Sequence, residues 1–92
     1  MKYTPCLTDK CFFTGAENGL ECHHIFGGNP NRKLSEKYGM KVMLHYTRHN
    51  QPPLGVHHNL DLNLELQQFG QRKFQEMYPE LDFIKIFGKN YL

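Results

Sequence analysis

The chain has 92 residues, which is enough for one small hydrophobic core and too few for two. Leu, Ile, Val and Phe make up a quarter of them, above the roughly 20% below which disorder becomes common. A domain of this size is only marginally stable by itself, so a bound metal ion or a partner would help it. We therefore expect one domain over residues 1–92, with an irregular arm at residues 1–10.

The composition favours a protein of the cytoplasm with no membrane segment. No apolar run approaches the ~18 residues that a membrane-spanning helix needs, and no apolar stretch near the N-terminus resembles a secretory signal. Three cysteines are an odd number without repeated spacing, which argues against a disulfide framework. The net charge of +2 is too small to indicate a polyanionic partner by itself.

The strongest local bias is in the histidines, since all six lie between residues 23 and 58. Residues 23–59 also contain five basic residues and a single acidic one, Glu36. Imidazoles are common metal ligands, and Lys and Arg neutralise phosphodiesters, so this composition suits a site that handles phosphate near a metal. The alternative is a solvated basic surface with incidental histidines. The histidines are His23, His24, His45, His49, His57 and His58.

The first half of the chain predicts two strands. The apolar and aromatic runs at 11–13 and 20–26 are separated by residues 14–19, whose glycines suit a tight reversal. Side chains alternate between the faces of a strand, so His23 and His24 should point apart. A glycine-rich break follows the second run.

The middle of the chain alternates helix and strand. Residues 31–38 predict a short basic helix that ends at Gly39, and 41–46 predict a strand. Residues 47–51 could form one or two helical turns before Pro52 ends them.

The last third predicts two helices. Alternate leucines at its start would also fit a strand, but some twenty residues without proline favour a helix over 59–78 with Asn59 as its N-cap. Pro79 ends that helix, and 81–87 predict a second one closed by Gly88.

The cysteines leave a structural zinc site open. Cys6 and Cys11 could pair with His45 and His49, at the limit of the usual spacing for zinc ligands. Cys22 is predicted to pack as a small apolar side chain.

Seven short motifs, spread over the chain from Cys11 onward, occur together in one group of proteins. They are CFFTG at 11–15, LECHHIFGG at 20–28, NRKLSEKYG at 31–39, HN at 49–50, GVHHN at 55–59, GQRKF at 70–74 and IFGKNYL at 86–92. In combination they resemble the phage-encoded HNH endonucleases, in particular the Ref-like group, which is related to the RecA-dependent nuclease Ref.

The resemblance implies an α+β fold of the ββα-metal type, in which a two-stranded hairpin and a helix hold one divalent cation, Mg²⁺ or Mn²⁺. It assigns the general base to His24, metal ligands to His23 and His49, and a third ligand to His57. The choice between His57 and its neighbour His58 stays open. Asn50 would take the positioning role of the middle Asn in the HNH name. Many relatives brace the hairpin with zinc held by two Cys-x-x-Cys pairs, but the matching positions here are Cys11, Thr14, His45 and Arg48, so we expect no structural zinc.

The activity implied by the resemblance is hydrolysis of a DNA phosphodiester, as a nick or a double-strand cut. Phosphates beside the cut bond would be gripped by Arg32, Lys33, Lys37 and Arg48. Implied partners are DNA and a recombinase filament or another phage DNA-processing protein, in the cytoplasm of a bacterial host. Two alternatives stay open: a non-catalytic binding module held by zinc, and a decayed HNH scaffold kept as an accessory. The oligomeric state stays open as well.

Overall fold

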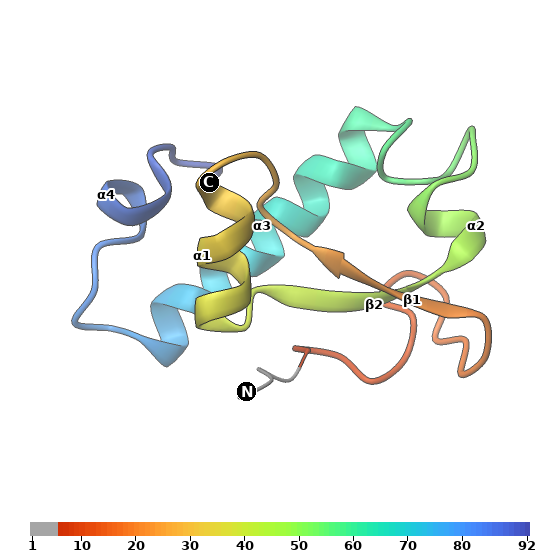
Figure 1. Ribbon diagram of the computed structural model, residues 1–92, viewed down its shortest axis with the longest axis horizontal. Coiled ribbons are helices and arrows are strands. Elements are labelled where there is room, and N and C mark those ends of the chain that lie inside the picture. The colour runs from red at the N-terminus through yellow and green to blue at the C-terminus, as the bar shows by residue number, and fades with distance from the viewer. Residues whose placement is uncertain (1–5) are drawn as a thin grey trace.

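The computed structural model describes residues 6–92, which form a small mixed α+β domain (Figure 1). Two strands and four helices follow one another as β1 (Leu20–His24), α1 (Asn31–Tyr38), β2 (Lys41–His45), α2 (Tyr46–His49), α3 (Leu60–Met77) and α4 (Phe83–Phe87). The expected α+β class is confirmed. Residues 6–10 of the predicted arm form neither helix nor strand, and its first five residues lie outside the described part of the chain.

β1 and β2 pair as a two-stranded antiparallel sheet. The register runs from Leu20 opposite His45 to His24 opposite Lys41, and α1 connects the two strands. The sheet therefore brings the histidine pair of β1 next to a strand that lies some twenty residues further along the chain.

The predicted strand at 11–13 is wrong. The chain turns back there, because Gly15 donates to the carbonyl of Cys11 at 2.8 Å and Cys11 donates to that of Ala16 at 2.9 Å. Gly15 has φ +75°, a left-handed conformation that glycine adopts without steric cost. The run still touches the sheet, since Phe12 donates to the carbonyl of Met43 at 3.0 Å.

α1 has the predicted bounds, because Gly39 at its C-terminus takes φ +74°. The buried hydroxyl of Ser35 accepts from the backbone of Phe26 at 3.1 Å and donates back to its carbonyl at 2.9 Å. This pair of bonds joins α1 to the segment that leaves β1.

The predicted C-terminal helices are also present. Asn59 caps α3 by accepting from the backbone of Leu62 at 3.0 Å, and α4 ends at Gly88 in a left-handed conformation. Leu66 and Phe74 of α3 are fully buried in one core with Val42 and Leu44 of β2.

Gly70, in the interior of α3, lets this helix pack closely against the end of β1. A Cβ at this position would lie 2.9 Å from Cγ2 of Ile25, so α3 can approach the end of β1 only because a side chain is missing. Among residues 6–92, no helix is long and apolar enough to cross a membrane.

Candidate metal centre

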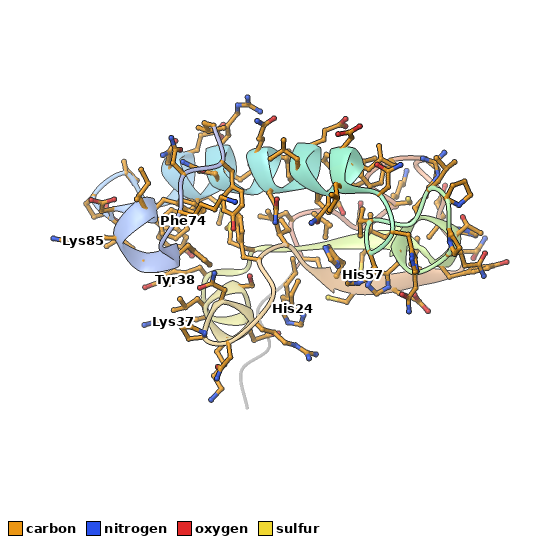
Figure 2. The ribbon with its side chains drawn as sticks, turned by 90° about the horizontal axis from the view of Figure 1, so that it is seen from above. His24, Lys37, Tyr38, His57, Phe74 and Lys85 are labelled. Atoms are coloured by element: carbon orange, nitrogen blue, oxygen red, sulfur yellow. The ribbon has the colours of Figure 1, made fainter. Side chains whose placement is uncertain are left out.

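β1 carries His23 and His24 on opposite faces, as the alternation of strand side chains predicts. His23 is 6% exposed, and its cross-strand partner Val42 is fully buried. His24 is more exposed and lies beside α1, whereas His57 lies in the loop before α3 (Figure 2).

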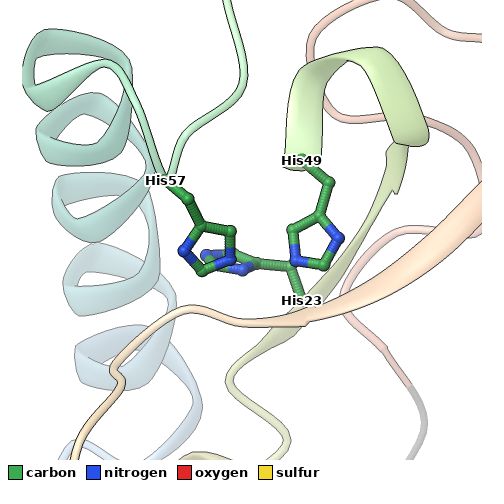
Figure 3. Close-up of side chains that lie close together, drawn as sticks. All are labelled: His23, His49 and His57. Atoms are coloured by element: carbon green, nitrogen blue, oxygen red, sulfur yellow. The ribbon is translucent and has the colours of Figure 1, made fainter. Parts of the chain in front are cut away.

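His23 meets two further histidines, His49 at the end of α2 and His57 (Figure 3). One ring nitrogen of each residue lies within 4.8 Å of those of the other two. The ring centroids are 5.2 Å apart for His23 and His49, 5.3 Å for His23 and His57, and 4.8 Å for His49 and His57. Three imidazole nitrogens this close can serve as ligands of one metal ion.

The burial of His23 suits it to be a ligand. Its Nε2 is buried and has no hydrogen-bond partner among the described residues, although buried polar atoms nearly always have one. Burial, helped by the nearby rings of His49 and His57, lowers the pKa of His23 to about 3. The ring is therefore neutral at physiological pH, which is the form that binds metal. A metal ion in the cluster would satisfy the orphaned nitrogen.

His49 is oriented by a carboxylate. Its Nδ1 lies 2.8 Å from Oε1 of Glu21, which precedes His23 by two residues on the same face of β1. When Nδ1 donates to Glu21, the lone pair of the neutral ring is on Nε2. Histidine ligands of metals typically make such a bond through their other nitrogen, which fixes the tautomer and raises the basicity of the ligand.

His57, the third ligand, lies in a loop that is hydrogen-bonded to the backbone of α2. Val56 donates to the carbonyl of Arg48 at 2.8 Å, and His57 donates to that of His49 at 3.3 Å. Val56 is buried in the core, so the loop is anchored directly before the ligand. Burial is the main cause that lowers the pKa of His57, which keeps this ring neutral as well.

His58 points elsewhere, although it follows His57 directly. Its Nε2 lies 3.0 Å from the backbone carbonyl oxygen of Asn50. The structure therefore places His57, and not His58, in the cluster with His23 and His49.

Glu36 links His24 to a buried lysine. Its Oε1 lies 3.0 Å from Nε2 of His24, and its Oε2 lies 2.7 Å from Nζ of Lys41, whose side chain is fully buried. The hydrogen bond from Lys41, followed by that from His24, lowers the pKa of Glu36, which is thus ionised at neutral pH. A carboxylate only accepts hydrogen bonds, so Nε2 of His24 donates and the lone pair of the neutral ring is on Nδ1.

His24 and the three clustered histidines share one cavity of about 450 Å³. All four histidines line it, and so do Gly27 and Gly28 in the segment that follows β1. The remaining lining residues are Cys22, Ile25, Arg32, Asn63 and Gln67.

The four predicted DNA-binding residues differ in their position relative to the cavity. Arg32 lines the cavity, and Lys33 lies with it in an adjoining hollow of about 350 Å³ beside His24. Lys37 is exposed one turn further along α1, with its Nζ 5.2 Å from the ring centre of Tyr38. Arg48, in α2, lines neither space.

Asn50 does not reach the cavity. It is exposed at the end of α2 and is not among the residues that line the site. The asparagine that does line the cavity is Asn63, in the first turn of α3.

The zinc site that the cysteine spacing left open is wrong. Cys6 contacts Cys22, with the two sulfur atoms 3.4 Å apart, and His45 pairs through Nδ1 with the hydroxyl of Thr47 at 2.7 Å. His49 belongs to the histidine cluster instead. Cys22 is only half-buried and contacts the sulfur of Cys6, so it does not pack as the small buried apolar side chain that the sequence predicts.

Sequence reasoning did not identify several residues of the site. A signal existed for Glu36, the single acid in a basic segment, and for Glu21, which shares a strand face with His23. Asn63 and Gln67 are four residues apart at the start of α3, a spacing that puts both on one side of a helix. Lys41 gave no such signal, because its burial follows from the pairing of β2.

The donor set is three imidazoles, with no carboxylate among the residues that line the cavity. Imidazole ligands suit Zn²⁺ and other transition metals, whereas Mg²⁺ prefers oxygen ligands.

The chain was compared with known protein families, curated proteins and solved structures, and it matches none of them.

Proposed function

We propose that this protein is a metal-dependent endonuclease of the HNH type, related to the Ref-like group, that hydrolyses DNA phosphodiester bonds. The observation that carries the proposal is that four histidines line one cavity in two different arrangements. Three of them offer nitrogens to one ion, and His24 is held separately by a carboxylate. A hydrolase of this type needs this combination, a metal ligand set beside a free base.

His23, His49 and His57 would hold the ion, and three ligands leave coordination positions for substrate. When bound, a divalent ion supplies Lewis-acid stabilisation for the negative charge that develops on the phosphate. Among the two ions expected from the resemblance, the nitrogen donors favour Mn²⁺ over Mg²⁺, and Zn²⁺ fits them as well.

His24 is the proposed general base. Glu36 accepts the proton of its Nε2, so the lone pair of Nδ1 is available to take a proton from water as it attacks phosphorus. Lys41 holds the other oxygen of the carboxylate and thereby fixes its position. Glu36 acts through His24 and is a positioning residue.

Arg32 and Lys33 are the two cations that line the cavity or the hollow beside it, together with this base. We propose that they bind the phosphates that flank the cut bond, with Lys37 extending the contact along α1. Such contacts position the duplex and carry little sequence information.

A supercoiled-plasmid nicking assay with Mg²⁺, Mn²⁺, Zn²⁺ or EDTA tests the proposal. His24→Ala should lower the rate by roughly 100- to 10,000-fold, the usual contribution of a general base, while DNA binding stays nearly unchanged. His58→Ala is the matched control, because His58 lies outside the cluster, and should keep the rate.

Full activity of His24→Ala would refute the role of the base. Tightly bound zinc together with no nicking in Mn²⁺ would favour the non-catalytic module, in which the three histidines only stabilise the fold.

A further inference from the structure

Three sulfur atoms lie together on the face of the sheet that carries His24, which is opposite to the face of His23. One of them belongs to Cys22, which also lines the cavity of the histidine cluster. Sγ of Cys6 is 3.4 Å from Sγ of Cys22 and 3.7 Å from Sδ of Met43. Cys22 and Met43 are direct partners across β1 and β2. All three residues are half-buried, so a small ion can reach them.

The backbone holds these sulfurs in place. Leu7 donates to the carbonyl of Lys41 at 2.7 Å, and the hydroxyl of Thr8 accepts from the backbone of Met43 at 3.1 Å. These bonds fasten the segment after Cys6 along β2. The three donors therefore come from three separate segments, and none of them is a histidine of the cluster.

We propose that Cys6, Cys22 and Met43 form a binding site for copper(I). With bonds of about 2.3 Å, the length of a zinc–sulfur bond, three sulfur ligands around one ion would lie roughly 4 Å apart. The sulfur atoms are 3.4 and 3.7 Å apart here, so small movements would admit the ion. Thiolate and thioether donors together select a soft ion. Zinc is a poorer fit, because it takes four ligands from Cys, His, Asp and Glu, and a thioether is not among them.

Binding replaces two protons by one cation: both thiols lose a proton, and the ion joins two thiolates and one neutral thioether. Without metal Cys6 is a thiol, because burial and the neighbouring Cys22 raise its pKa to about 11. The cation of Lys41 acts on Cys6 in the opposite direction and partly offsets the negative charge of the complex. Bound copper would tie the N-terminal segment to both strands.

The site is tested by anaerobic titration of the reduced protein with copper(I) against the chelator bicinchoninate. We expect one ion per chain, and X-ray absorption should show that sulfur atoms are bound directly to it. Cys6→Ala and Cys22→Ala should each weaken binding on the order of 100-fold or more, and Met43→Leu roughly 10-fold.

Three controls separate this site from the rest of the molecule. Cys11→Ala and Met77→Leu remove sulfur elsewhere and should leave the affinity unchanged, and so should His49→Ala, which removes a ligand of the histidine cluster. Loss of copper binding in His49→Ala, or wild-type binding in Cys6→Ala and Cys22→Ala, would overturn the proposal.

A second measurement on the wild-type protein avoids variants that fold poorly. Copper(I) should slow alkylation of Cys6 and Cys22, read by mass spectrometry of peptides, and leave the reaction of Cys11 unchanged. Equal rates with and without copper, or conversion of Cys6 and Cys22 to a disulfide with loss of the ion, would refute the site. Neither result bears on the proposed nuclease activity, which uses other residues.

Discussion

His24 and Glu36 are joined by a 3.0 Å contact between Nε2 and Oε1, across a separation of twelve residues. The contact joins the end of β1 to α1 and determines which nitrogen of His24 is free. Glu36 is itself anchored by the buried Lys41 at 2.7 Å. The orientation of the proposed base thus depends on a residue that the cavity lining does not include.

Glu36→Gln should lower the nicking rate roughly 10- to 100-fold, in the range seen when an outer-shell partner is lost. The amide keeps the shape but no longer fixes which ring nitrogen carries the proton. Because Glu36 bonds to His24 and Lys41 and is not a member of the ligand cluster, the affinity for Mn²⁺ or Zn²⁺ should stay the same, as measured by calorimetry. An equal rate in Glu36→Gln and wild type would exclude the positioning role.

Arg32→Ala and Lys33→Ala should weaken DNA binding, because Arg32 lines the cavity and both cations line the hollow beside His24. Each should also reduce the slope of log affinity against log salt by about 1. Lys85→Ala is the matched control, since Lys85 lies on α4 at the far end of the molecule from His57 (Figure 2). Fluorescence anisotropy at several salt concentrations measures all three, and an effect of Lys85→Ala as large as that of Arg32→Ala would contradict the assignment.

Gly55→Ala should weaken metal binding without touching a ligand. A Cβ at this position would lie 2.6 Å from backbone atoms of Gln51, so the loop that carries His57 must shift. Overpacking of this kind costs about 1–3 kcal/mol of unfolding free energy. Gly27→Ala is the control, because a Cβ there meets nothing within 4 Å. Equal metal affinity in both variants would show that the loop does not position His57.

The stability of the metal-free protein should fall on acidification. The pKa of His23 is about 3 in the folded state and about 6.5 in an unfolded chain. Below pH 6.5 the unfolded chain binds a proton that the folded ring does not, so the free energy of unfolding falls as pH drops from about 6.5 towards 3. The loss is up to about 1.4 kcal/mol per pH unit.

Urea unfolding at pH 7 and pH 5, in EDTA, measures this effect. The loss of stability between the two pH values should be smaller in His23→Gln, which cannot titrate, than in wild type. His58→Gln should behave as wild type. An equal loss in His23→Gln and wild type would mean that His23 is not the group responsible.

Local sequence determined the elements and the region of the site. Gly39, Asn59 and Gly88 mark helix ends because a left-handed or capping residue acts on its immediate neighbours. The alternation of strand side chains is equally local, so the opposite orientations of His23 and His24 follow from their adjacency alone. The clustering of histidines between residues 23 and 58 located the candidate ligands.

Tertiary structure decided which of these residues meet. β1 pairs with β2 and not with residues 11–13, His57 and not His58 joins the cluster, and Asn50 stays outside the cavity. Contacts between distant segments likewise pair Glu21 with His49 and Glu36 with His24. Such contacts depend on how the core packs and how loops close, which involves residues distant in sequence, whereas helix caps and strand alternation depend only on neighbours along the chain.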